Sequence, residues 1–249
     1  GKHVLVEKPI DISLERAEKL IKACKDNNVK LSVISQHRYD KAVIWLKKGI
    51  DSGLFGNLIL GRASVKWNRT KNYYESGFGW RRKEEISGGG VLILQAIHYV
   101  DLLLWLFGDV KSVYGKIDTR VHNMEVEDVG AGVIKFKSGA IAVLEGTTGV
   151  IKNLPNELEV HGEKASVILN DNGEKCWIKV CNMNNFGYYE KLKNKFIFKL
   201  GKISAQINDF INSIIENKEP FISGEDGKKA LEVILGIYKS SKLNKEVKL

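Results

Sequence analysis

The chain has 249 residues, of which 43% are hydrophobic and 28% charged, and these fractions exclude a disordered chain and a fibrous repeat. Lys and Arg number 39 against 30 Asp and Glu, so the formal net charge is +9. This excess favours an anionic ligand, although solubility alone also accounts for it. No stretch approaches the roughly 20 uninterrupted apolar residues of a membrane span, and no nucleic-acid-binding motif accompanies the basic segments. We therefore expect neither a membrane nor a nucleic acid as a partner.

Three cysteines are present, Cys24, Cys176 and Cys181, and none belongs to a CxxC pair. An odd number of cysteines with no histidine close in sequence is atypical of a disulfide framework or a structural zinc site. We therefore expect a reducing, cytoplasmic compartment and no bound metal.

The first 35 residues have the pattern of a strand, a helix and a second strand. Residues 3–6 form a short apolar run that ends before Pro9, because proline cannot donate to a strand ladder. Ser13 is placed as the N-cap of an amphipathic helix that reaches Cys24, and residues 31–35 form a second strand of the buried type. This order predicts one parallel βαβ crossover.

After this unit the pattern changes to a helix and then to strands. Asp40 is placed as the cap of an apolar helix, and from Asn57 the hydrophobic period becomes two. Turns at residues 137–139 and 171–173 contain glycine, which predicts antiparallel hairpins. The strand-like runs are residues 57–67, 110–119, 130–137, 140–147, 157–161, 165–169 and 176–180, and helices are predicted at 203–215 and, after a Ser223 cap, at 226–240. The sequence thus predicts an α/β segment followed by an α+β segment, with a boundary near Gln36.

The most informative stretch is the glycine triplet 88–90 and the segment 91–108 that follows it. Three glycines impose a large entropic cost, so we expect them to allow close approach of the backbone to a ligand or a neighbouring helix. The segment is apolar nearly all round, which predicts a buried helix. Its polar side chains Gln95, His98 and Asp101 share an arc of about 120°. Buried polar groups must be paired, so we expect this stripe to face a cleft or a polar partner. The alternative is a network of hydrogen-bonded polar groups inside the core. That alternative fits Asp101 best, as an ion-pair or capping partner.

Several segments resemble one enzyme family. Residues 1–9, GKHVLVEKP, resemble its GKHVxxEKP element, and residues 88–101 resemble its GGGxLxxxxxHxxD helix. Residues 36–39 resemble its crossing between domains, and residues 207–211 and 220–227 resemble its C-terminal helices. The order and spacing of these elements resemble the glucose–fructose oxidoreductase/inositol dehydrogenase (Gfo/Idh/MocA) family of nicotinamide-dependent sugar dehydrogenases.

The resemblance implies a two-part organisation. Residues 1–36 would be the C-terminal remnant of a dinucleotide-binding Rossmann domain, with one βαβ unit. Residues 37–249 would form a substrate-binding and oligomerisation domain of the α+β class. Its centre would be a large, predominantly antiparallel open sheet with helices on one face.

The resemblance also implies an NAD(P)-dependent oxidoreductase that transfers hydride to or from a secondary hydroxyl or keto group of a sugar or nucleotide sugar. Lys8 would touch the substrate hydroxyl and the nicotinamide region, and His98 would shuttle the hydroxyl proton, a task that needs a group titrating near neutrality. Contacts to the cofactor, NAD or NADP, are implied for Glu7, Lys8, Pro9 and Arg38. The family commonly has a cis peptide bond before the equivalent of Pro9.

Two features depart from the family pattern. Leu94 occupies the position four residues before the histidine, where the family usually has Asp or Asn, and a leucine can neither orient an imidazole nor relay a proton. The chain also has no opening GxGxxG-like turn to hold a pyrophosphate. We therefore expect the chain to be the C-terminal two-thirds of an oxidoreductase that binds nicotinamide nucleotide poorly by itself.

The segment 66–83 interleaves cations with aromatic residues, which suits a sugar or nucleotide that carries phosphate or carboxylate; a solvated strand and loop is the alternative. The Trp80-Arg81 pair ahead of the glycines resembles family members that act on nucleotide-linked amino sugars, which favours a nucleotide-sugar substrate over a free polyol. We assign substrate binding to Tyr74, Trp80, Arg81 and Gln95.

Other functions remain open at the level of sequence. An open antiparallel sheet needs its exposed face covered, and family members usually do so by pairing sheet to sheet, so a homodimer or homotetramer is expected. If Leu94 abolishes turnover, the alternative is a non-catalytic module of the same fold that binds a sugar or serves oligomerisation. A degenerate gene product that folds only in part is the third alternative.

Overall fold

The computed structural model describes the backbone of residues 1–171, 175–182, 196–199 and 203–249, and the side chains of the first and last of these ranges. The helices are α1 (Leu14–Asp26), α2 (Lys41–Asp51), α3 (Lys71–Glu75), α4 (Glu84–Ser87), α5 (Ile97–Phe107), α6 (Ile203–Ile215) and α7 (Gly224–Leu243), with 3-10 helices η1 (Gln36–Tyr39) and η2 (Gly77–Arg82) and the π-helical turn η3 (Leu92–Ala96). The strands are β1 (Val4–Val6), β2 (Leu31–Val33), β3 (Leu58–Lys66), β4 (Val110–Asp118), β5 (Val129–Phe136), β6 (Ile141–Thr147), β7 (Asn156–Gly162), β8 (Ala165–Asp171), β9 (Lys175–Asn182), β10 (Phe196–Lys199) and β11 (Val247–Lys248).

The predicted βαβ unit is confirmed. Strands β1 and β2 pair in parallel, with Val4 opposite Leu31 and Val6 opposite Val33. Helix α1 connects them, and the Ser13 hydroxyl caps it by accepting from the backbone N–H of Arg16. The carboxyl ends of both strands therefore meet at one edge of this small sheet, which is where ligands bind in open α/β sheets.

The second sheet has nine strands in the order β10-β9-β8-β7-β3-β6-β5-β4-β11. Only β3 and β6 pair in parallel among these strands, so the predicted, predominantly antiparallel sheet is confirmed. The turn at residues 137–139 joins β5 to β6, and Gly139 adopts a φ of +96° in it. The other predicted turn includes residues 172 and 173, which lie outside the described residues. Strand β10 was not predicted from the sequence.

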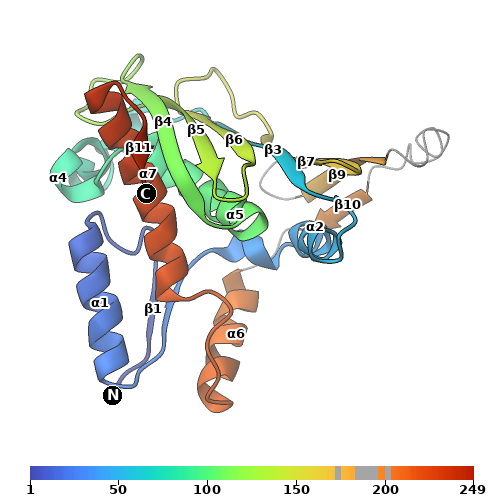
Figure 1. Cartoon of the computed structure of the whole chain (residues 1–249). Helices are drawn as coiled ribbons and strands as arrows, with labels where there is room; N and C mark the ends of the chain where they lie inside the picture. Colours follow the sequence, from blue (N-terminus) through green and yellow to red (C-terminus); the bar gives the residue numbers. More distant parts are fainter. Residues whose placement is uncertain (172–174, 183–195, 200–202) are drawn as a thin grey trace.

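Helices cover one face of this sheet (Figure 1). Side chains of β5 alternate strictly, with Ile134 and Phe136 buried and Val133 and Lys135 exposed. On the buried face, Ile237 of α7 lies against Gly132, and Phe107 of α5 lies against Gly61. The opposite face, here called the open face, carries the exposed side chains of Tyr114 and Val133.

Helix α7 packs on both parts of the molecule. Gly224 at its start lies against Leu31, and Gly227 lies against Val33, so its first turns cover the strand β2 of the βαβ unit. Its later turns cover the large sheet, and it runs from one part to the other in Figure 1. The Ser223 cap is confirmed, and Asp226 completes a capping box with it, so the helix begins two residues before the predicted start.

The glycine triplet serves packing inside the protein. Gly88 and Gly89 have φ values of +72° and +151°, and a Cβ on Gly89 would lie 2.2 Å from the Tyr238 hydroxyl of α7. A Cβ on Gly90 would lie 1.8 Å from the carbonyl oxygen of Glu127. The buried Glu127 carboxylate accepts from the backbone N–H groups of Gly90 and Leu92 and from Tyr238. The expected close approach is therefore to a neighbouring helix, α7, and to the segment that precedes β5.

The helix behind the glycines is buried, as predicted. The continuous segment Glu84–Phe107 has the length and hydropathy of a membrane-crossing helix, but 83% of its most apolar window is buried inside the fold. Burial against the sheet accounts for this apolar character without a membrane.

Replacing Gly90 by alanine should destabilise the fold by about 1–3 kcal/mol, because the new Cβ collides with backbone rather than with a movable side chain. Gly146→Ala is the matched control, since its Cβ would lie 3.3 Å from the nearest side-chain atoms. Urea unfolding of the two variants measures the difference. Equal free energies of unfolding for both would contradict this account of the triplet.

Candidate active site

One pocket lies where the βαβ unit meets helix α5. It is entered at the carboxyl ends of β1 and β2, where the Lys8–Pro9 peptide bond is cis, as the family resemblance implies. Lys8 and His98 both line it, so the two residues predicted to be catalytic share one hollow. The remaining lining residues include Pro9, Ile34, Ser35 and Asp101.

The Lys8 ammonium is held by backbone rather than by an acidic side chain. Its Nζ donates to the carbonyl oxygen of Leu94 at 2.5 Å. Leu94 lies in the π-helical turn η3, a rare geometry that is found mostly at functional sites. The carbonyl of residue 94 thus contacts the lysine, while its side chain is apolar. Burial lowers the pKa of Lys8, and the Glu7 carboxylate opposes part of this shift.

His98 is a buried imidazole that lacks a hydrogen-bond partner on Nδ1 within the described part of the chain. Its pKa lies well below the usual value, first because of burial and then because of the positive charges of Lys8 and His37. A neutral imidazole in this position accepts a proton rather than donating one at neutral pH.

A second histidine lies beside it. The His37 and His98 rings meet edge to face, with 5.3 Å between their centroids. Asp40 contacts Nδ1 of His37 at 2.8 Å. Asp40 occupies the N-cap position of α2, as predicted, but its carboxylate contacts the imidazole and makes no side-chain cap hydrogen bond.

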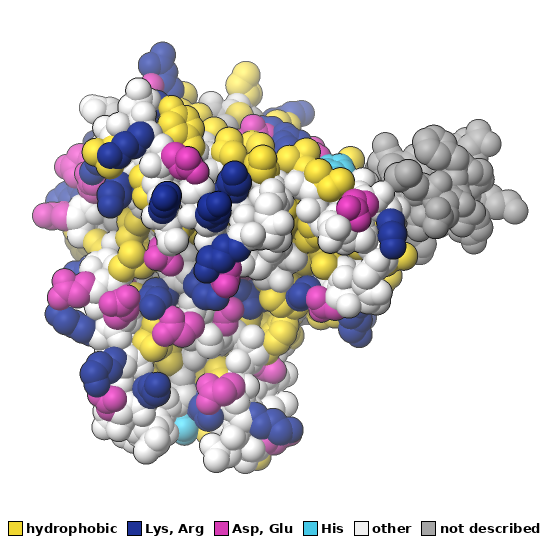
Figure 2. Space-filling model, viewed as in Figure 1, with side chains coloured by type: hydrophobic (Ala, Val, Ile, Leu, Met, Phe, Trp, Pro, Cys, Tyr) yellow, Lys and Arg dark blue, Asp and Glu magenta, His cyan; other side chains and the backbone are white. Residues whose placement is uncertain are grey.

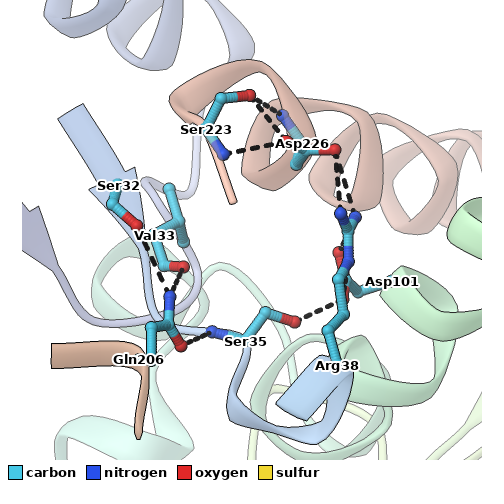
Figure 3. A network of polar contacts seen from close by, with 8 residues as sticks. All are labelled: Ser32, Val33, Ser35, Arg38, Asp101, Gln206, Ser223 and Asp226. Carbon is cyan, nitrogen blue, oxygen red and sulfur yellow. Dashed lines mark hydrogen bonds and ion pairs between the residues drawn. The ribbon is translucent and has the colours of Figure 1, made fainter. Parts of the chain in front are cut away.

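Arg38 lies in a buried ion-pair network (Figure 3). Its guanidinium donates to both carboxylate oxygens of Asp101, at 2.8 and 2.6 Å, and to Asp226 at 3.1 Å. Ser35 donates its hydroxyl to Asp101 as well, and Gln206 of α6 bonds the backbone of Ser35 at 2.9 Å. The ion-pair alternative for Asp101 is confirmed, and the predicted cofactor contact of Arg38 would have to coexist with these bonds.

The predicted substrate-binding residues separate into two places. Tyr74 is buried, bonds the Thr148 hydroxyl and lines a different pocket beside His122, away from Lys8. Trp80 and Arg81 stack on each other, with the guanidinium carbon 4.5 Å from the ring centroid.

Tyr73, which was not assigned from the sequence, connects this stack to the pocket. Arg81 and Arg69 lie 4.7 and 5.0 Å from the centroid of its ring, and Gln95 donates to its hydroxyl at 2.9 Å. Gln95 precedes His98 by about one turn, so Tyr73 and the two guanidinium groups on its ring are joined to the helix that carries His98.

One buried polar atom of a residue that lines this pocket is unpaired. Within the described residues, five buried side-chain atoms have no hydrogen-bond partner, and His98 Nδ1 is one of them. Buried polar groups are almost always paired, so this atom indicates a ligand that supplies the missing bond. Gln36 Oε1 and Gln95 Oε1, each near a lining residue in sequence, are also unpaired.

Comparison with known proteins agrees with this geometry. The sequence model of the GFO/IDH/MocA C-terminal domain matches residues 43–168, and that of the oxidoreductase family, NAD-binding Rossmann fold, matches residues 1–35. The chain belongs to the GFO/IDH/MocA family of oxidoreductases.

Relatives within this family include an oxidoreductase, P35, from Formosa agariphila, which is 30% identical over 67% of this chain and 51% of its own length. A myo-inositol 2-dehydrogenase from Thermotoga maritima is 23% identical over 100% of this chain and 73% of its own length. This chain thus spans about half the length of some curated relatives and nearly three quarters of others.

Solved structures of the family are similar along the whole chain. The WlbA dehydrogenase from Bordetella pertussis, in complex with NADH and UDP-GlcNAcA, superposes with a TM-score of 0.84 at 29% identity, covering 100% of this chain and 72% of that one.

Replacing Arg38 by methionine should lower the free energy of unfolding of this GFO/IDH/MocA protein by about 3–5 kcal/mol at neutral pH, because it leaves the buried Asp101 carboxylate unpaired. The exposed Lys19–Glu15 pair provides the control, and Lys19→Ala should cost less than about 0.5 kcal/mol. Urea unfolding followed by circular dichroism measures both. A loss below about 1 kcal/mol for the arginine variant would show that the network is not stabilising.

Proposed function

We propose that this protein is an NAD(P)-dependent oxidoreductase that oxidises a secondary hydroxyl, or reduces the corresponding ketone, of a sugar or nucleotide sugar. The observation that carries the proposal is that Lys8 and His98 line one pocket at the carboxyl ends of two parallel strands. The unpaired Nδ1 of His98 leaves this imidazole available to a ligand hydroxyl group.

The two side chains have distinct roles in this reaction. His98, neutral and buried, takes the hydroxyl proton during oxidation and returns it during reduction. Lys8, which points to the same pocket, stabilises the oxygen as negative charge develops on it, since an ammonium in a partly dry site interacts more strongly than in water. The carbon–hydrogen bond breaks with hydride transfer to the nicotinamide ring, the chemistry that the cofactor supplies when bound.

The residues present fit one end of such a cofactor. The segment Glu7-Lys8-Pro9 follows β1 at the edge of the βαβ unit, where the nicotinamide end of a dinucleotide would meet His98. No glycine-rich turn follows β1, and the triplet 88–90 is occupied by contacts with Glu127 and Tyr238. These residues would therefore hold the nicotinamide end and not the pyrophosphate.

The stack around Tyr73 favours an anionic, nucleotide-linked substrate. Arg69 and Arg81 contribute two positive charges on one ring, and Gln95 connects that ring to the catalytic helix. Guanidinium groups held on aromatic faces bind phosphate or carboxylate while aromatic rings contact a sugar or base. In Figure 2, Lys and Arg otherwise lie interspersed with Asp and Glu over the visible face. A UDP-linked sugar acid, the class bound in the Bordetella pertussis structure, is the substrate we expect.

His98→Ala and Lys8→Ala should each lower kcat/KM by about 10²-fold or more, because each removes a group that acts on the transferred proton or the charged oxygen. The measurement is reduction of NAD+ or NADP+ with UDP-GlcNAcA and, in parallel, with myo-inositol. Lys19→Ala, an exposed lysine on α1, is the control and should turn over normally. Normal rates in the His98 variant or in the Lys8 variant would overturn the proposal.

The open face of the large sheet is proposed as a dimer interface. A row of cross-strand neighbours runs across it, from Tyr114 to Val133, Val143, Arg62 and Glu159. Its apolar end is exposed, with Val133 at 42%, and Arg62 at its centre bonds several carboxylates. This face is apolar at one end, and the charges at its centre are paired with each other. Such a face suits an isologous contact with a second copy of the chain.

Val133→Glu should convert the proposed dimer into a monomer, because two added carboxylates would be buried at the apolar end of the interface. Val121→Glu, an exposed valine in the loop after β4, is the matched control and should leave the assembly unchanged. Sedimentation velocity measures the mass of each. A monomeric parent chain at micromolar concentration would contradict the interface.

A further inference from the structure

The buried Nδ1 of His98 has no hydrogen-bond partner among the described residues. Leu94, one turn earlier, is apolar. The nearest imidazole is His37, whose ring meets that of His98 edge to face at an interplanar angle of 78°. His37 belongs to the 3-10 helix η1 that joins the βαβ unit to the rest of the chain, so its ring is placed by an element independent of α5.

Asp40 fixes the state of His37. The carboxylate contacts His37 Nδ1 at 2.8 Å from a position three residues later, and it is almost fully buried. A buried carboxylate at this distance favours the imidazolium over the neutral ring. The charge then lies about 5 Å from the His98 ring, and at an effective dielectric constant of about 20 it opposes a second proton there by at least tenfold.

Of the other charged groups around the two rings, some raise and some lower the proton affinity of an imidazole. Lys8 faces His98 from the end of β1, Asp101 lies one turn further along α5 but is neutralised by Arg38, and Asp171 lies at the end of β8. Burial lowers the pKa of His37, but Asp40, with smaller effects of Asp171 and Asp101, outweighs it and raises that pKa.

For His98 the causes reinforce each other. Burial lowers its pKa most, and the charges of Lys8 and His37 lower it further. Of these two charges, only that of His37 is set by a dedicated carboxylate at hydrogen-bond distance, because the Lys8 ammonium is bonded to a carbonyl oxygen.

We propose that His37, oriented and charged by Asp40, is a positioning residue that holds His98 in its neutral, proton-accepting form. The proposal rests on the dehydrogenase function proposed above. No atom is transferred to His37 in the reaction. The hydroxyl O–H bond breaks, the proton forms an N–H bond on His98, and the two neighbouring positive charges then favour its release.

The experiment is an NMR titration of the histidine side chains in the whole 249-residue chain, without cofactor. In His37→Gln, loss of the neighbouring charge should move the half-protonation point of His98 to higher pH, by about tenfold in proton concentration. Asp40→Asn should shift the two rings in opposite directions: His37 to lower pH, because it loses its carboxylate, and His98 to higher pH. His122→Gln removes the other buried His–Asp pair and is the matched control, with the His98 titration unchanged.

A merely structural role predicts a different result. If His37 and Asp40 only support the loop, both variants would change stability and leave the titration of His98 where it is, and this outcome would overturn the proposal. The opposite shifts in Asp40→Asn would support it whether or not the chain turns over any substrate.

The pH dependence of kcat/KM distinguishes a failure of this proposal from a failure of the proposed function. If the protein is a dehydrogenase, activity is lost as pH falls through the pKa of the base. The acid limb of kcat/KM should therefore move to higher pH in His37→Gln, while kcat on the plateau changes little. Turnover with an unmoved acid limb would reject the role of His37 and keep the proposed function. Shifted titrations without turnover would keep the electrostatic coupling, which does not depend on the reaction.

Discussion

The ion pair between Arg38 and Asp101 is the contact on which the geometry of the site depends. Arg38 follows the βαβ unit, Asp101 lies on the central helix α5, and Asp226 reaches the same guanidinium from the start of α7. A buried carboxylate without its cation is strongly unfavourable, so these three elements cannot separate without a large cost. His37 is adjacent to the arginine and His98 lies one turn before the aspartate. The same bond that joins the elements therefore sets the distance between the two imidazoles.

Position 94 shows how a backbone group can stand where a side chain is expected. Leu94 lies in a π-helical turn, and its carbonyl oxygen accepts from the Lys8 ammonium. A carbonyl is neutral, so it orients the lysine without raising its proton affinity as a carboxylate would. The lysine is thus positioned by this contact, but the negative charge that an acid would bring near His98, which would raise the pKa of that ring, is absent. The charged neighbours Lys8 and His37 both lower the pKa of His98 instead.

The sequence predicted those parts of the fold that depend on local pattern. The capped helices after Ser13 and Ser223, the parallel crossover and the antiparallel hairpins follow from periodicity and turn residues, and the structure contains them. The pairing of Lys8 with His98 in one pocket was also anticipated, because family motifs fix their order along the chain. What local pattern could not give was the partner of each polar side chain. Asp40 has the position of a cap, yet it bonds His37, and a His-x-x-Asp spacing was the only local sign.

The same limit explains why Tyr73 was missed in favour of Tyr74. Adjacent residues on a short helix point about 100° apart, and sequence alone does not say which of the two faces the neighbouring helix. The structure directs Tyr74 inward to Thr148 and Tyr73 to Gln95. Tyr73 therefore holds two guanidinium groups on its ring and, through Gln95, the helix that carries His98 on its hydroxyl. Under the proposed function, a ligand with an anionic group at one end and a carbinol at the other would span from that ring to His98, and Tyr73 would link recognition to proton transfer.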